Sequence, residues 1–135
     1  RRVEIVANDP CVVRGDETLL RSAIENVIRN AIRYTGEETA VEVSLRVQSA
    51  SAPASRLAVV SVRDHGPGVP DDALDHLFRP FYRVDDGQAR QSGGTGLGLA
   101  IAERAVRLHG GSATAGNAPD GGLVIELSIP AEKES

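Results

Sequence analysis

The sequence predicts a single α+β domain in which a mixed sheet carries its helices on one face. The chain has 135 residues, 41% of them hydrophobic and 25% charged, which is an ordinary composition for one folded domain. Apolar residues alternate in some segments and recur at helical spacing in others, so both strands and helices are expected. No repeat and no internal boundary divides residues 1–135, which we therefore expect to form one unit.

The first residues predict two short strands. Val3 and Ile5 alternate with polar neighbours, and Val12–Val13 form a second apolar segment after the turn-forming pair Asp9–Pro10. The single cysteine, Cys11, lies in this second segment, so we expect it to be buried. One cysteine excludes an internal disulfide.

A long helix is expected next, followed by alternating strands and helices. Asp16 is placed to cap the helix, and Gly36 to end it soon after Tyr34. Its apolar residues recur at helical spacing: Leu19, Leu20, Ala23, Ile24, Val27, Ile28 and Ala31. Further apolar runs predict strands at about 41–47, 57–62, 112–115 and 123–129. Helices are expected at about 71–78 and 96–109.

One stripe of the long helix is polar. Asn26, Asn30 and Arg33 stand at positions i, i+4 and i+7 and share one face. Asparagine is a mediocre helix former, so two within a helix need a reason. A solvated face is one reason. The other is functional: an Asn oxygen can ligate Mg²⁺ and Arg33 can neutralise phosphate charge. Tyr34 then either stacks on a base or is a helix-end hydrophobe.

Two segments are rich in glycine. Residues 64–68 (Asp-His-Gly-Pro-Gly) follow an apolar strand, and the carboxylate of Asp64 can accept a hydrogen bond from an amine such as that of adenine. An ordinary Gly-Pro turn explains the same residues. Residues 93–99 enter a helix, whose first N–H groups can cradle phosphate, although a glycine-rich linker is the alternative. The polar segment at about 83–95 is expected to be a mobile lid.

Several functional classes are excluded or disfavoured. The formal net charge is −4 and no basic block occurs, so we expect no nucleic-acid partner. No apolar run approaches the roughly 20 residues that cross a bilayer, so we expect no membrane contact by this domain itself. The three histidines have no metal-ligand spacing and form no Ser-His-Asp pattern.

Together, these segments resemble the catalytic and ATP-binding domain of sensor histidine kinases, within the gyrase–Hsp90–kinase–MutL superfamily. The resemblance rests on four boxes in the right order and spacing: an N box at 25–35, a G1 box at 64–68, an F box at 78–83 and a G2 box at 94–99. It covers nearly the whole chain. The wording of the F and G2 boxes is most similar to Cpx-type envelope-stress sensors.

The resemblance implies the Bergerat ATP-binding fold, a two-layer α/β sandwich with a mostly antiparallel sheet, and implies ATP and Mg²⁺ as cofactors. On the N box it implies that Asn30 ligates Mg²⁺, supported by Asn26. Arg29 and Arg33 would flank the phosphates, and Tyr34 would stack on the adenine.

On the other boxes, the resemblance implies that Asp64 binds the adenine amino group in a pocket shaped by Gly66 and Gly68. Arg83, with Val84 beside it, would contact the γ-phosphate, so Asn30 and Arg83 are the implied catalytic residues. The backbone of the G2 box would wrap the phosphates: Gly94, Thr95, Gly96, Leu97, Gly98 and Leu99. One departure puts a threonine contact near the adenine in doubt, because residues 121–124 are Gly-Gly-Leu-Val where many relatives have a Gly-Thr pair.

Within the superfamily, Asn26 favours a kinase over an ATPase. The ATPases carry a general-base glutamate four residues before the metal-binding asparagine, and an amide at that position cannot take a proton from water. Glu25 is adjacent, but one residue is about 100° of helix rotation away.

The implied function is transfer of the γ-phosphate to a histidine on the phosphoacceptor helical domain of the same protein, a dimer at full length. A response regulator would act downstream, and the domain would be cytoplasmic in a parent protein of the inner membrane. Two alternatives stay open: a nucleotide-binding module without catalysis, and a serine kinase of the anti-sigma type.

Overall fold

The computed structural model describes residues 1–49, 56–82 and 96–132. Its strands are β1 (Arg2–Asn8), β2 (Ala40–Ser49), β3 (Arg56–Arg63), β4 (Ser112–Asn117) and β5 (Leu123–Ala131). Its helices are α1 (Glu17–Tyr34), the short 3₁₀ helix η1 (Asp71–His76) and α3 (Gly98–Leu108). The order of elements agrees with the sequence prediction except near the N-terminus.

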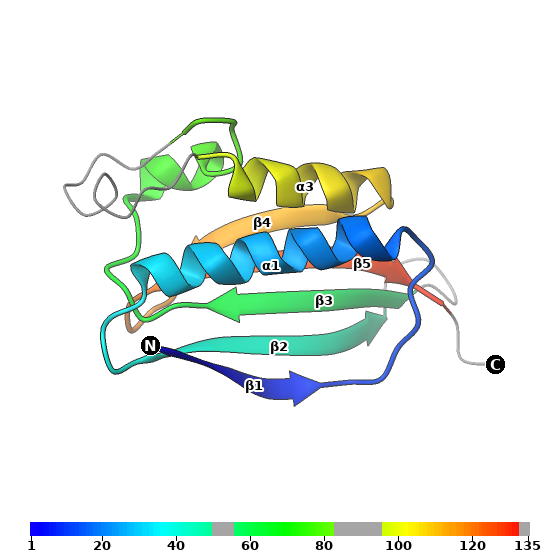
Figure 1. Ribbon diagram of the computed structural model, residues 1–135, viewed down its shortest axis with the longest axis horizontal. Coiled ribbons are helices and arrows are strands. Elements are labelled where there is room, and N and C mark those ends of the chain that lie inside the picture. The colour runs from blue at the N-terminus through cyan, green and yellow to red at the C-terminus, as the bar shows by residue number, and fades with distance from the viewer. Residues whose placement is uncertain (50–55, 83–95, 133–135) are drawn as a thin grey trace.

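The strands form one five-stranded sheet in the order β1-β2-β3-β5-β4. β1 runs parallel to β2, and the other neighbouring pairs are antiparallel. α1 and α3 lie side by side across one face of this sheet (Figure 1). The predicted two-layer α+β architecture, with a mixed and mostly antiparallel sheet, is confirmed.

The core lies between the helices and the sheet and is aliphatic, as the scarcity of aromatic residues requires. Small residues on the inner face of each helix let the helices approach the strands closely. The fully buried members of this core are Ala23, Val27, Val41, Ala102, Val106 and Leu127. Asp16 caps α1 as predicted, because its side chain accepts a hydrogen bond of 3.0 Å from the backbone N–H of Leu19.

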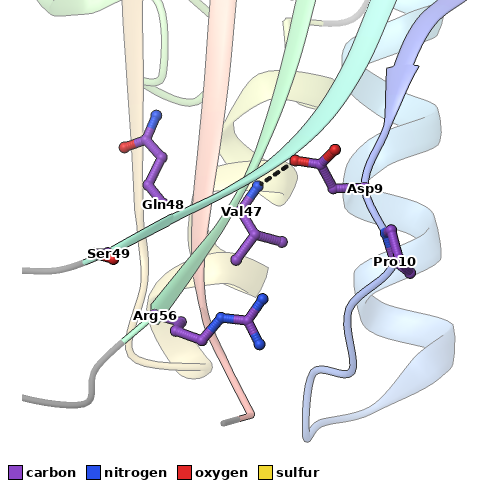
Figure 2. Close-up of a pocket in the computed structure, with 6 residues that line it drawn as sticks. All are labelled: Asp9, Pro10, Val47, Gln48, Ser49 and Arg56. Atoms are coloured by element: carbon purple, nitrogen blue, oxygen red, sulfur yellow. Dashed lines mark hydrogen bonds between the residues drawn. The ribbon is translucent and has the colours of Figure 1, made fainter. Parts of the chain in front are cut away.

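The predicted second strand at Val12–Val13 is wrong. The pairing of β1 with β2 ends at Asn8, and Pro10 has no N–H to continue a ladder. Beyond Asn8, the side chain of Asp9 bonds β2: it accepts a hydrogen bond of 3.0 Å from the N–H of Val47 (Figure 2). An open pocket of about 380 Å³ lies there, lined by Asp9, Pro10, Val47, Gln48, Ser49 and Arg56. Cys11, expected to be buried, is half-buried in the segment that follows.

Two predicted helix boundaries also move. The helix expected over residues 71–78 is a 3₁₀ helix that ends at His76. The helix expected from residue 96 begins at Gly98, because Gly96 has a φ of +79° and cannot lie in a right-handed helix. That displacement leaves Gly96 and Leu97 as a bend that leads into α3.

Candidate functional site

The polar stripe of α1 faces the start of α3. Asn26 and Asn30 are half-buried, whereas Arg29 is exposed. The side-chain nitrogen of Asn26 donates to the carbonyl oxygen of Ser22 at 2.9 Å, which fixes the amide. Its oxygen then lies so close to Gly98 that a Cβ on Gly98 would be 3.3 Å away. The N-box helix and the beginning of the G2 helix therefore meet at Asn26.

Asn30 lies one turn further along the same face. Within the described part of the chain, its side-chain amide has no hydrogen-bond partner. Arg33 and Tyr34, near the end of α1, are half-buried. An asparagine that makes no internal hydrogen bond keeps its oxygen for a ligand or for water.

Asp64 is the buried carboxylate of the site, at 2% exposure. Its Oδ1 accepts hydrogen bonds from the N–H groups of Gly66 at 2.9 Å and Leu123 at 3.1 Å. Burial raises the pKa of this carboxyl above its ordinary value, although the two N–H donors and the nearby His65 and Arg63 oppose the rise. Among residues 1–49, 56–82 and 96–132, Oδ2 has no hydrogen-bond partner.

Glycines allow the backbone to pack closely around Asp64. A Cβ on Gly66 would overlap the carbonyl oxygen of Tyr34, at the end of α1. Gly122 has a φ of +92°, and a Cβ there would overlap the carbonyl oxygen of Asp64 itself. Gly68, at a φ of +73°, would bring its Cβ within 2.7 Å of the side-chain oxygen of Asn117. These approaches leave room for a backbone but not for a side chain.

A backbone hydrogen bond of 2.8 Å from the N–H of Phe81 to the carbonyl of Gly96 joins the residues that flank the predicted lid. Phe81 itself is 71% exposed, at a φ of +65°. Gly96 and Leu97 are half-buried before the first turn of α3, and Leu99 is buried within that turn. The remaining predicted site residues lie outside the described residues: Arg83, Val84, Gly94 and Thr95.

The sequence patterns missed three residues that shape this site. Thr35, directly after α1, is buried and accepts a hydrogen bond of 3.0 Å from the N–H of His65. The side-chain amide of Asn117 bonds both backbone groups of Val69. Its oxygen accepts from the N–H of Val69 at 2.9 Å, and its nitrogen donates to the carbonyl of Val69 at 2.6 Å. Gly122 lies where many relatives have a Gly-Thr pair, and that departure does not indicate its close approach to Asp64. Thr35 is the last residue of the N box, but the box does not indicate that Thr35 bonds the N–H of His65.

The histidines have structural partners. The ring of His65 lies 2.6 Å from a carboxylate oxygen of Glu42, and that of His76 packs at 5.6 Å from the ring of Tyr82. His109 is hydrogen-bonded to backbone atoms through both ring nitrogens. No cluster of three or more His, Cys, Asp or Glu side chains that could hold a metal occurs in the described segments.

Comparisons with known proteins agree with this geometry. Residues 15–133 match the family of histidine kinase-, DNA gyrase B- and HSP90-like ATPases. The sensor histidine kinase CpxA of Escherichia coli is 41% identical over 126 residues, which are 93% of this chain and 26% of that protein. WalK of Bacillus subtilis is 35% identical over 137 residues, 99% of this chain and 22% of that protein.

Solved structures give the same result. The mycobacterial sensor histidine kinase MprB superposes with a TM-score of 0.79 at 28% identity, over 98% of this chain and 84% of that chain. Full-length ShkA, solved in complex with AMPPNP, has a TM-score of 0.74 at 27% identity, over 98% of this chain and 26% of that chain.

The chain belongs to the family of histidine kinase-, DNA gyrase B- and HSP90-like ATPases. Within it, the chain is an ATP-binding catalytic domain of the sensor histidine kinase type, as the four boxes predicted, and its resemblance to Cpx-type sensors is confirmed. It spans about a quarter of the length of the curated relatives named above. No helix in the described part of the chain is long and apolar enough to cross a membrane.

Proposed function

We propose that this domain binds Mg·ATP between α1, the loop after β3 and the start of α3, and presents the γ-phosphate to a histidine on a separate helical domain. Asp64 carries the proposal. The Asp64 residue is buried, and among the described residues its two backbone donors both bond Oδ1, so Oδ2 is left open to accept from a ligand. The amino group of adenine is a donor of the right kind for Oδ2.

The helix α1 supplies the polar groups for the other end of the nucleotide. Within the described residues, the side-chain oxygen of Asn30 has no partner, and it suits Mg²⁺, which prefers a few protein oxygens together with water and phosphate. Asn26 would support it, and Arg29 and Arg33 would neutralise phosphate charge. Tyr34, whose carbonyl contacts Gly66, would place its ring against the purine.

The start of α3 is positioned to receive phosphate. Gly98 lies against Asn26, so the first turn of α3, whose N–H groups can bind phosphate, is next to an amide of α1. A neighbour of similar fold, full-length ShkA, was solved in complex with AMPPNP, which supports nucleotide binding by a domain of this fold. Arg83, Val84, Gly94 and Thr95 would complete the phosphate contacts, with Arg83 nearest the γ-phosphate.

Asn26 favours transfer to a protein over hydrolysis. An amide cannot take a proton from water, and the hydrogen bond from its nitrogen to the carbonyl of Ser22 fixes this amide in place. When bound, Mg·ATP supplies the phosphoryl group, and the chain contributes positioning and charge neutralisation. We propose that the acceptor is the phosphoacceptor helical domain of the parent protein, dimeric and held in the inner membrane, with a response regulator downstream.

Isothermal calorimetry with the 135-residue chain tests the nucleotide assignment. ADP and a non-hydrolysable ATP analogue are each titrated with and without Mg²⁺. We expect binding of both, with higher affinity when Mg²⁺ is present. Absence of binding under all four conditions contradicts the assignment. In the full-length parent protein, radiolabel from γ-labelled ATP should appear on a histidine, and label on a serine would instead favour the anti-sigma class of kinase.

A further inference from the structure

We propose that Thr35 is a positioning residue for purine recognition, which acts by holding the loop that carries Asp64. This inference rests on the proposed binding of adenine by Asp64. Thr35 follows the last residue of α1, is 1% exposed, and is among the few polar side chains in the described segments that are buried. A buried hydroxyl must be fully hydrogen-bonded, and its partners reveal what it holds.

The partners of Thr35 form a chain with a defined direction. The Oγ1 of Thr39 is hydrogen-bonded to the carbonyl oxygen of Gly36, which can only accept, so the Thr39 hydroxyl donates there. The Thr39 oxygen then accepts from the Thr35 hydroxyl at 2.8 Å. The Thr35 oxygen, with its hydrogen engaged, accepts from the backbone N–H of His65 at 3.0 Å. The donor and the acceptor of each of these three hydrogen bonds are therefore determined.

This chain ends one residue from the carboxylate that we assign to adenine. His65 lies between Asp64 and Gly66, whose N–H donates to Asp64 Oδ1 at 2.9 Å. On the other side, the N–H of Asp64 donates to the carbonyl of Leu123 at 3.0 Å. The loop is therefore held from β5 on one side and from the end of α1, through Thr35, on the other. Without the Thr35 hydroxyl, the N–H of His65 loses its partner and the α1 side of the loop is released.

Release of that side should weaken recognition of the base and spare recognition of the triphosphate. The phosphate groups would be contacted by Asn30 and the start of α3, neither of which Thr35 contacts in the described structure. Inosine triphosphate (ITP) separates the two effects. It carries the same triphosphate as ATP, but a carbonyl replaces the amino group that Asp64 would bind.

The experiment compares dissociation constants for Mg·ATP and Mg·ITP in four proteins: wild type, Thr35→Val, Thr35→Ser and Thr18→Val. Valine keeps the shape of threonine without the hydroxyl, and serine keeps the hydroxyl. Thr18 is an exposed threonine at the opposite end of α1 and serves as the matched control. We expect Thr35→Val to lower the preference for ATP over ITP about tenfold, which corresponds to one buried hydrogen bond, with ITP affinity nearly unchanged. Thr35→Ser should restore the preference, and Thr18→Val should leave it unchanged.

The outcomes separate this inference from the proposed function. If the wild type shows no preference for ATP, the adenine assignment of Asp64 fails. If the wild type prefers ATP and Thr35→Val keeps the full preference, or loses both affinities equally, the positioning role of Thr35 is overturned. Should Thr35→Val not fold, Thr39→Val removes the next link in the chain. A reduced ATP preference in Thr39→Val then supports the inference, and an unchanged preference contradicts it.

Discussion

The two ends of the α1–α3 pair use their polar side chains in opposite ways. The start of α1 and the end of α3 lie at the same end of the pair (Figure 1). There, His109 links the end of α3 to the residue that caps α1. Its Nδ1 donates to the carbonyl of Ala105 at 2.7 Å, and its Nε2 accepts from the N–H of Asp16 at 3.0 Å. Gly15 packs so closely on the ring that a Cβ would overlap it. Both ring nitrogens are therefore used within the fold.

At the other end, the polar groups keep part of their hydrogen-bonding capacity. Within the described residues, the Asn30 amide and the Oδ2 of Asp64 have no partner, although Asp64 is almost fully buried. Neither group is a fully enclosed atom without a partner, so each stays open to water or to a ligand that supplies the partner. A structural polar residue therefore differs from a binding one in how many of its donors and acceptors the fold already uses.

The largest expected effect follows from Asn30→Ala, at the end that keeps its capacity. If Asn30 ligates Mg²⁺ as we propose, its removal should weaken Mg²⁺-dependent nucleotide binding by at least about 100-fold. It should also abolish histidine phosphorylation in the full-length protein. Calorimetry with and without Mg²⁺ measures the first effect. Glu25→Ala, an exposed change on the same helix, is the control and should bind as the wild type does. Undiminished Mg²⁺-dependent binding by Asn30→Ala would remove Asn30 from the metal site.

The second prediction concerns the close packing of backbone around Asp64. Gly122→Ala places a Cβ on the Asp64 carbonyl at a positive φ, so we expect a loss of about 2 kcal/mol or more in the free energy of unfolding. Gly116 is the matched control, because a Cβ on it meets nothing within 4 Å. Gly116→Ala should be neutral or stabilise by up to about 1 kcal/mol. Urea denaturation of both variants measures the difference, and equal stabilities would contradict the close approach.

Gly122 also illustrates what the sequence could and could not predict. Periodicity is a local property, and it predicted α1, the sheet strands and the fold class. The four boxes predicted which segments meet, because their order and spacing match a known family. The contact between Gly122 and Asp64, or between Thr35 and His65, joins residues far apart in the chain and leaves no periodic signal. The first contact follows from the pairing of β3 with β5, and the second from the position of the end of α1 next to the loop after β3.

Where local prediction was wrong, a tertiary contact had replaced the local rule. Val12–Val13 has the apolar character of a strand, but Asp9 and Pro10 end the pairing before it. The carbonyl of Val12 instead accepts one hydrogen bond, at 2.7 Å, from the N–H of Glu132. A short apolar pair carries too little pattern to indicate which partner it will find.

The third prediction tests the end that His109 ties together. His109→Ala removes two hydrogen bonds, so we expect a loss of about 1–2 kcal/mol in unfolding free energy. Nucleotide affinity should change by less than about twofold, because the hydrogen bonds of His109 stabilise the fold and lie at the end of the helices opposite the proposed nucleotide site. A double-mutant cycle with Gly15→Ala sharpens the test. Gly15→Ala should be less destabilising in the His109→Ala background, where the overlapping ring is absent. Additive effects would contradict a direct contact.

The smallest expected effect is the pH dependence that Asp64 contributes to stability. Burial raises its pKa in the folded state above 3.8, so the folded protein holds this proton more tightly than the unfolded chain does. Its contribution to stability is therefore fully present below 3.8 and is lost as the pH rises through the folded pKa. Asp64→Asn cannot titrate, so the unfolding free energy of wild type minus that of Asp64→Asn should fall over this range and level off above it. Two N–H donors and neighbouring positive charges offset part of the burial, which keeps the change small. Urea denaturation of both proteins across the acid range measures the difference. A difference that rises with pH would mean that the fold already stabilises the ionised carboxylate. Asp64 would then need no ligand to donate a hydrogen bond to Oδ2.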